Sequence, residues 1–117
     1  MEKRRLGRTD MDVTVLGFGG AGTSGESIQN IGRVLNSALD AGINVIDTAE
    51  CYEGGEDSIG KTISRKRRDE FFLFTKCGHP RGIGSEDWSA NSILESIERS
   101  LRRLQTDRID LIQLHGC

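Results

Sequence analysis

The sequence has no long hydrophobic run, few aromatic residues and no strong excess of charge of either sign. Of its 117 residues, 35% are hydrophobic and 5% aromatic, and 16 basic against 18 acidic side chains give a formal net charge of −2. A bilayer-spanning helix needs ~20 consecutive apolar residues, and a nucleic-acid-binding surface is basic. We therefore expect no membrane and no nucleic-acid partner. Residues 1–8 also lack a secretory apolar stretch, which favours a cytoplasmic protein.

Cysteine and proline are scarce as well. The three cysteines, Cys51, Cys77 and Cys117, are odd in number and widely spaced, and this pattern fits neither a disulfide framework nor a C-x-x-C metal pair. We expect three reduced thiols and no metal site. The single proline stands against 15 glycines, which predicts many tight turns between regular elements.

What the chain does contain is a regular alternation of β-compatible runs and helical periods. A hairpin is predicted over residues 4–6 and 11–16, with its turn at 7–10. Beyond it, strands are predicted over 16–20, 44–48, 71–75 and 109–114, and helices over 27–41, around 59–63 and over 89–104. The basic residues 65–68 are expected to form the solvated end of the short helix. On the last helix, the residues expected to face inward are Ile93, Leu94, Ile97, Leu101 and Leu104.

The order β-α-β-α-β-α-β implies right-handed crossovers and a parallel sheet covered by helices. Two architectures then compete, a doubly wound sheet and a (β/α) barrel. Asp47, Lys76 and His115 end the second, third and fourth predicted strands, and Tyr52 follows on the loop after Asp47. The carboxyl ends of successive barrel strands converge on one rim, where barrel enzymes carry their chemistry. These polar residues therefore favour the barrel.

Two longer motifs surround these residues. Residues 42–49 (Gly-Ile-Asn-Val-Ile-Asp-Thr-Ala) precede Tyr52 and residues 56–60 (Glu-Asp-Ser-Ile-Gly), and residues 100–111 lead to His115. The first motif is similar to the Asp-Thr-Ala and downstream Glu-x-x-(apolar)-Gly pattern of the aldo/keto reductase family, and the second to its helix-to-strand approach to the catalytic histidine. The resemblance covers nearly every residue. It implies an α/β fold of the (β/α)8 TIM-barrel type, of which residues 1–117 would form the N-terminal half as one incomplete domain.

The resemblance also implies a function. It implies an oxidoreductase that uses NADP, or NAD, to reduce an aldehyde or ketone to an alcohol, with Asp47, Tyr52, Lys76 and His115 as its catalytic residues. The chemistry fits, because the Lys76 ammonium eases release of the Tyr52 proton and Asp47 keeps that ammonium charged. A neutral His115 can donate a hydrogen bond to the substrate carbonyl oxygen. Taken singly, each residue also has a structural interpretation as an ordinary strand-end or loop residue.

Residues 17–22 (Gly-Phe-Gly-Gly-Ala-Gly) match the G-x-G-x-x-G pattern of dinucleotide-binding proteins. That pattern should open directly into a helix, but residues 23–26 intervene here, which disfavours a Rossmann-type dinucleotide binder. The resemblance instead implies that the residues on the cofactor side are Gly20, Ala21, Gly22 and Thr23, together with Asp47. A flexible glycine turn is the other interpretation of this segment.

The length of the chain raises a separate question, because a complete (β/α)8 barrel takes ~250 residues. Four parallel strands without successors leave two open edges and an unfilled interior. Besides a small-molecule carbonyl or alcohol, we therefore expect a second copy of the chain, or a missing C-terminal half, as a partner. Three functions stay open: a reductase, a non-catalytic half-barrel interaction or regulatory module, and the less favoured Rossmann-type binder.

Overall fold

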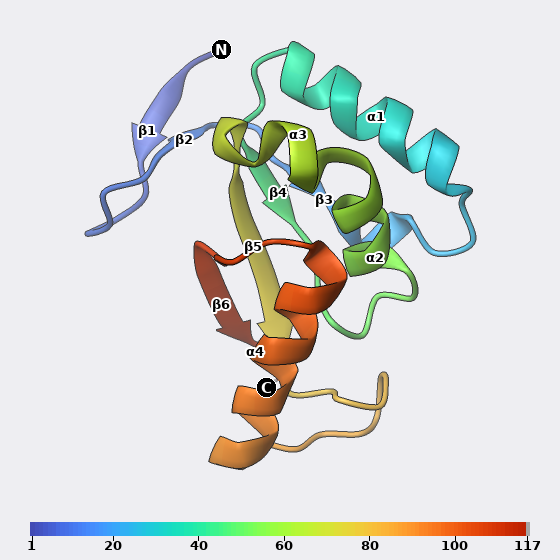
Figure 1. The fold of residues 1–117 in the computed structure, drawn as a ribbon. Helices are drawn as coiled ribbons and strands as arrows, with labels where there is room; N and C mark the ends of the chain where they lie inside the picture. Colours follow the sequence, from blue (N-terminus) through green and yellow to red (C-terminus); the bar gives the residue numbers. More distant parts are fainter. Residues whose placement is uncertain (117) are drawn as a thin grey trace.

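A four-stranded parallel sheet is the centre of the computed structural model, which describes residues 1–116 (Figure 1). Its strands are β3 (Phe18–Gly19), β4 (Val45–Asp47), β5 (Phe72–Cys77) and β6 (Leu111–Leu114). They lie side by side in the order in which they occur along the chain. A doubly wound sheet reverses its strand order at a switch point, so this consecutive order is that of a barrel.

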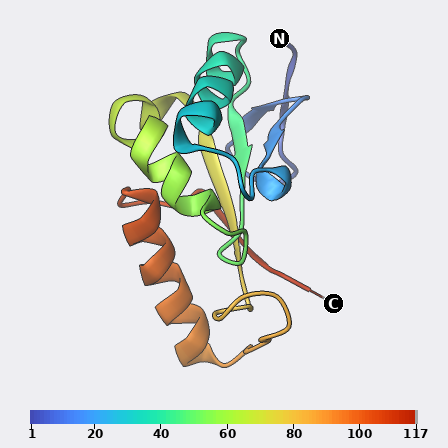
Figure 2. The same ribbon diagram turned by 90° about the vertical axis from the view of Figure 1, so that its right-hand side faces the viewer.

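Helices connect the strands and cover one face of the sheet (Figure 2). They are α1 (Ile28–Asp40), α2 (Gly55–Ile59), the π-helical turn η2 (Gly60–Ser64), α3 (Arg65–Arg67), the 3₁₀ turn η3 (Arg68–Glu70) and α4 (Ala90–Leu104). The predicted short helix is therefore the middle of a longer helical run. The uncovered face is the inner surface expected of part of a barrel. Along residues 1–116, no helix is long and apolar enough to span a bilayer.

Serine side chains set the starts of the two long helices. Ser27 Oγ accepts a hydrogen bond from the backbone N–H of Asn30 at 3.1 Å, and Ser89 Oγ accepts one from Ser92 at 3.3 Å. Each bond satisfies one of the N–H groups that the first turn of a helix leaves unpaired. Both predicted long helices are confirmed to within one residue at each end.

The N-terminal hairpin lies at the end of the sheet where the parallel strands begin (Figure 1). Its strands β1 (Lys3–Arg5) and β2 (Asp12–Thr14) pair antiparallel, which confirms the predicted hairpin with shorter strands. The backbone N–H of Thr14 donates to Asn44 Oδ1 at 2.8 Å, and the N–H of Asn44 donates to Thr14 Oγ1 at 3.1 Å. Because Asn44 directly precedes β4, this reciprocal pair holds the hairpin at the amino end of the sheet.

The hydrophobic core lies between the sheet and the helices. Its buried members are Ile31, Leu35, Leu39, Ile46, Ile59, Ile63, Phe71, Leu73 and Leu104. The three residues from α1, Ile31, Leu35 and Leu39, follow one another at four-residue spacing and so form one stripe along the helix. Full burial of one such side chain stabilises a fold by ~1.5–3 kcal/mol. This packing fixes α1 on the strands that end at the rim.

The inner face of α4 is polar rather than apolar. Its buried residues are Ser92, Ser96, Ser100 and Leu104. The predicted inward face is therefore wrong in part, because only Leu104 of that set is fully buried and Leu94 is 61% exposed. The physical reason is that α4 covers two buried carboxylates, Glu50 and Glu56. Buried carboxylates need hydrogen-bond donors, which serine and arginine supply and apolar side chains do not.

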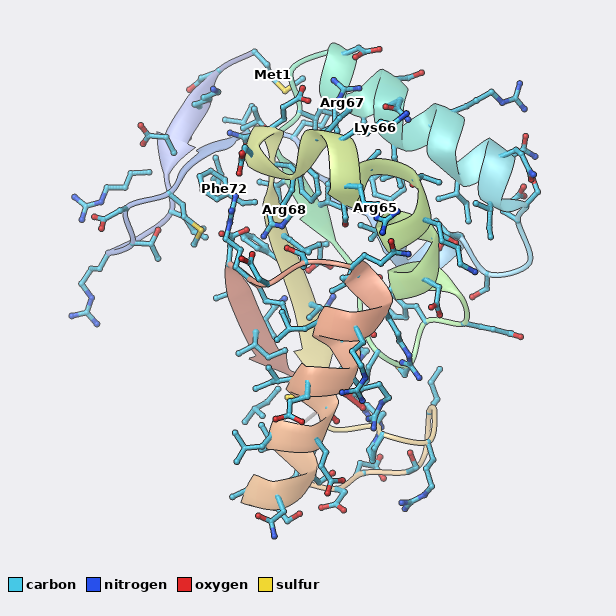
Figure 3. All side chains as sticks on the ribbon, in the orientation of Figure 1. Met1, Arg65, Lys66, Arg67, Arg68 and Phe72 are labelled. Carbon is cyan, nitrogen blue, oxygen red and sulfur yellow. The ribbon has the colours of Figure 1, made fainter. Side chains whose placement is uncertain are left out.

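The basic cluster at residues 65–68 is only partly solvated (Figure 3). Arg65 and Lys66 are exposed as predicted, but Arg68 is only 9% exposed. Its guanidinium forms an ion pair with Asp110 Oδ2 at 2.7 Å. Because Asp110 directly precedes β6, Arg68 ties the end of the helical run to the start of the last strand. The prediction of a wholly solvated cluster is wrong for Arg68, whose partner lies far away in the sequence.

Gly60 is the point of closest approach between η2 and α4. A Cβ atom at this position would lie 2.1 Å from the carbonyl oxygen of Arg103. The backbone of Gly60 is ordinary right-handed helix (φ −56°, ψ −45°), so it is the lack of space that requires glycine here. The two elements can pack this closely only because Gly60 has no side chain.

We therefore expect Gly60→Ala to lower the free energy of unfolding by about 1–3 kcal/mol, because α4 must move away from η2. Urea denaturation followed by circular dichroism measures the change. Gly19→Ala is the matched control, since Gly19 has extended backbone and open space around its Cβ position. A Gly60→Ala protein as stable as the wild type would contradict this close packing.

Candidate active site

Ionisable side chains from three neighbouring strands meet where those strands end. Asp47 is the last residue of β4, Lys76 is the penultimate residue of β5, and His115 directly follows β6. Tyr52 lies on the loop after β4, where its backbone N–H donates to the carbonyl of Ala49 at 3.2 Å in a tight turn. The carboxyl ends of parallel strands share one edge, and the structure brings these four predicted side chains together there.

An ion pair forms the centre of this rim. Lys76 Nζ donates to Asp47 Oδ2 at 2.6 Å and to the carbonyl oxygen of Thr48 at 2.8 Å. The Lys76 side chain is only 14% exposed, and a buried ammonium is costly unless it is paired. Gln113 Nε2 donates to the other Asp47 oxygen at 3.1 Å. Both carboxylate oxygens of Asp47 are therefore bonded, which fixes the ammonium in place.

Sequence reasoning missed Gln113. The sequence offers one indication of its role, which is its position two residues before His115. Alternate residues of a strand share one face, so Gln113 is expected on the same face as His115. In the sheet, Gln113 pairs in register with Lys76, which explains why its amide reaches the ion pair.

The Tyr52 ring lies close to both the Lys76 ammonium and the His115 imidazole. Lys76 Nζ is 5.2 Å from the centroid of the Tyr52 ring, and the His115 ring meets the Tyr52 ring edge-on, with centroids 5.7 Å apart. Gly55 permits the loop conformation, because a Cβ there would lie 3.2 Å from the Cβ of Tyr52. The phenol is thus held beside a fixed positive charge.

His115 is held in an environment that favours its neutral form. Its backbone N–H donates to the carbonyl of Cys77 at 2.8 Å, and its Nδ1 lies 3.3 Å from Cys51 Sγ. Burial lowers the pKa of His115, and the positive charge of Lys76 and the neighbouring His79 lower it further. A neutral imidazole retains one N–H, so His115 can donate a hydrogen bond without carrying charge.

The glycine segment after β3 forms the 3₁₀ turn η1 (Gly20–Gly22) rather than opening into α1. Thr23 Oγ1 closes the turn by donating to the carbonyl of Gly20 at 2.8 Å. A Cβ at Gly20 would lie 3.0 Å from the carbonyl oxygen of Asp47, so the turn packs directly against the end of β4. The predicted cofactor-side residues therefore lie beside the rim, and that they bind a cofactor stays a prediction.

A buried carboxylate lies behind the rim. Glu56 is 2% exposed; Thr75 Oγ1 donates to its Oε2 at 2.9 Å, and Arg103 Nη1 lies 3.4 Å from its Oε1. Burial raises the pKa of Glu56, and hydrogen bonds from Ser100 and Thr75 partly offset that effect. Because Thr75 precedes Lys76, Glu56 fastens the helical run to the strand that carries the ammonium.

The two cysteines among the described residues are free thiols. Cys51 and Cys77 are free, and burial raises the pKa of each. Cys117, also predicted to be a reduced thiol, lies outside the described residues. Within residues 1–116, no cluster of three or more histidine, cysteine or acidic side chains is placed to hold a metal ion.

The family is decided by comparison with known proteins. Residues 15–117 match the family model described as "Aldo/keto reductase family". The chain belongs to the aldo/keto reductase family. Its resemblance to that family and the predicted TIM-barrel fold class are therefore confirmed, and the doubly wound alternative is wrong.

Three similar proteins show how much of an aldo/keto reductase this chain represents. It is 40% identical over 122 residues to the uncharacterized oxidoreductase YqkF of Bacillus subtilis, which covers 99% of this chain and 39% of YqkF. It is 33% identical over 125 residues to L-galactose dehydrogenase of Arabidopsis thaliana, with 98% and 38% covered. The holo structure of aldo-keto reductase AKR11C1 from Bacillus halodurans matches at TM-score 0.88 and 41% identity, with 100% and 41% covered. The chain spans about two-fifths of the length of these proteins.

The electrostatics at His115 can be tested directly, because the chain has only two histidines. NMR titration should show His115 with a pKa below its ordinary value of 6.5. Lys76→Met should raise the pKa of His115, since it removes a nearby positive charge. Lys66→Met, at an exposed position, is the matched control, and His79→Gln identifies the two signals. If Lys76→Met leaves the pKa of His115 unchanged, the described placement of Lys76 near His115 is contradicted.

Glu56 gives a prediction about stability and pH. Its pKa is raised in the folded state, so the folded chain holds this proton more tightly than the unfolded chain does. The resulting stabilisation is complete below the ordinary value of 4.5 and is lost as pH rises through the folded pKa. The stability of the wild type relative to Glu56→Gln should therefore fall as pH increases, measured by urea unfolding at several pH values.

The matched control for this experiment is Glu95→Gln, which removes a carboxylate from an exposed position on α4. If the stability of the wild type relative to Glu56→Gln instead rises with pH, the fold stabilises the charged form of Glu56. The raised pKa of Glu56 would then be wrong.

Proposed function

We propose that the chain supplies the proton-transfer half of the active site of a reductase that converts an aldehyde or ketone to an alcohol with NADPH, or with NADH. The observation that carries this proposal is the position of Lys76 Nζ, 2.6 Å from the Asp47 carboxylate and 5.2 Å from the centroid of the Tyr52 ring. A fixed cation beside a phenol favours loss of the phenolic proton. Tyr52 is therefore the general acid.

The other residues have distinct roles in the proposed reaction. Lys76 stabilises the phenolate that Tyr52 becomes when its proton moves to the carbonyl oxygen. Asp47 keeps Lys76 charged and in position. His115 donates a hydrogen bond from its neutral ring to the same carbonyl oxygen, which orients the substrate and polarises its carbonyl carbon.

The reduced nicotinamide, when bound, supplies the hydride that the carbonyl carbon accepts. With the Tyr52 proton on oxygen, the product is an alcohol, and Tyr52 regains its proton from water. In the reverse direction the Tyr52 phenolate takes the proton of an alcohol, as microscopic reversibility requires.

The η1 turn is proposed as the cofactor side of the site. Gly20 packs against the end of β4, whereas the Cβ positions of Gly19 and Gly22 face open space. Backbone without side chains lets a planar ring approach closely. This supports a nicotinamide beside Gly20, Ala21, Gly22, Thr23 and Asp47.

The flanks of the sheet support a further part of the proposal. Near β3, Leu16 is 56% exposed and Val34 of α1 is 53% exposed; on the other side, Leu114 of β6 is 64% exposed and Leu94 of α4 is 61% exposed. Apolar rows on both flanks of the described residues are typical of a surface that another element covers. We propose that residues 1–117 belong to one larger barrel domain, whose activity needs polypeptide equivalent to the unmatched part of the relatives. A second copy of the chain is the alternative occupant.

The same flanks favour a second candidate function, a non-catalytic module that binds a partner through them. Sedimentation of the purified chain should show association that rises with concentration, and Leu114→Lys should weaken it. Ile83→Lys is the matched control, since Ile83 is 86% exposed and lies on the loop between β5 and α4 rather than on a strand or helix. A compact monomer at all concentrations would contradict docking at the flanks.

Catalysis can be tested in a chimera in which residues 1–117 replace the matching part of AKR11C1 from Bacillus halodurans. The chimera should oxidise NADPH in the presence of an aromatic aldehyde. Tyr52→Phe should lower kcat by roughly 10²–10⁴-fold, the usual contribution of a general acid, without weakening NADPH binding measured by fluorescence. Lys76→Met should lower kcat as well, and Lys66→Met is its matched control.

A folded chimera that binds NADPH and keeps its rate after Tyr52→Phe would overturn the catalytic assignment. A folded chimera that binds NADPH but reduces no aldehyde or ketone would favour the non-catalytic module.

A further inference from the structure

One contact at the rim has no part in the proton transfer described above. Cys51 Sγ lies 3.3 Å from His115 Nδ1. Among the described residues, no other side chain forms a hydrogen bond with the His115 ring; the His79 and Tyr52 rings pack against it edge-on, with centroids 5.3 and 5.7 Å away. Cys51 directly precedes Tyr52, so the loop that carries the phenol also carries this thiol.

The contact bears on the position of a single proton. A neutral imidazole carries one N–H, on Nδ1 or on Nε2, and the partner of one nitrogen decides which nitrogen it is. With the proton on Nε2, His115 Nδ1 accepts a hydrogen bond from the Cys51 S–H. With the proton on Nδ1, that N–H points at sulfur and Nε2 has none to donate.

The surroundings favour the first arrangement. Burial raises the pKa of Cys51 and lowers that of His115, so the sulfur keeps its proton and the ring stays neutral at neutral pH. An imidazole nitrogen is a better acceptor than a thiol sulfur, which accepts only weakly. The S–H of Cys51 therefore donates to His115 Nδ1, and the ring proton lies on Nε2.

We propose that Cys51 is a positioning residue that holds His115 in its Nε2–H tautomer, with this N–H free to meet a substrate carbonyl oxygen. The inference rests on the proposed function, in which His115 donates to that oxygen. The backbone bond from His115 to Cys77 fixes the main chain, and Cys51 fixes the ring. The thiol thus acts through His115 without touching substrate.

NMR of the ¹⁵N-labelled 117-residue chain tests this without any enzyme assay, because correlations between ring nitrogens and carbon-bound protons identify the protonated nitrogen. At pH values above the pKa of His115, the wild type should show this residue as the Nε2–H tautomer. Cys51→Ala should give a mixture of both tautomers. Cys51→Ser should restore Nε2–H, since a hydroxyl also donates, and Cys77→Ala, which removes the other thiol beside the rim, should leave the tautomer unchanged.

A wild-type chain with its proton on His115 Nδ1 would overturn the proposal, as would a Cys51→Ala chain with the wild-type tautomer ratio. Infrared spectroscopy gives a second measurement on the wild type, which needs no variant to fold. It should show one S–H stretching band shifted to low frequency by a strong acceptor, and protonation of His115 at low pH should remove that shift. A spectrum in which no S–H band responds to this titration contradicts the bond.

The chimera separates this inference from the proposed function. There Cys51→Ala should lower kcat about 10-fold, less than the roughly 10²–10³-fold cost of removing an oxyanion donor altogether, and Cys51→Ser should recover it. Loss of the tautomer preference with an unchanged kcat overturns the positioning role alone. An unchanged rate in Tyr52→Phe overturns the reaction assignment and leaves the tautomer measurement intact.

Discussion

The structure depends on one largely buried ammonium. Lys76 has little contact with water, and Asp47, which accepts its hydrogen bond at 2.6 Å, offsets the cost of burying an ammonium there. That bond forms only if β4 and β5 pair in the observed register, in which Asp47 lies opposite Phe74. Because the next strand supplies Gln113 to the second carboxylate oxygen, three strands must be aligned before the charge is stable. The hydrophobic core between the sheet and the helices stabilises this alignment of the strands.

A polar layer behind the rim extends the same constraint to the helices. Glu56 accepts from Thr75 on β5 and lies close to Arg103 on α4. Arg103 also donates to the carbonyl of Glu50 at 3.4 Å, two residues before Tyr52. The loop with the phenol is therefore held by α4 on one side and by the strands on the other. A buried polar network with directional bonds gives this loop a defined position, which apolar packing alone would specify less tightly.

Much of the site could be predicted from the sequence because Asp47, Lys76 and His115 each close an apolar strand, and parallel strands end at one edge. Gln113 could not, since an amide within a strand carries no motif. The inner face of α4 was misjudged because apolar periodicity locates a hydrophobic stripe, whereas this helix covers carboxylates. Arg68 and Asp110 lie 42 residues apart, and no local pattern shows that they meet.

The ion pair between Arg68 and Asp110 connects the helical run after β4 to the strand that leads to the candidate site. It anchors the segment that leads into β6, and β6 delivers both the amide that caps Asp47 and the imidazole that follows the strand. The group formed by Asp47, Lys76, Gln113 and His115 is thus complete only when β6 is in place, and the ion pair between Arg68 and Asp110 holds the start of that strand.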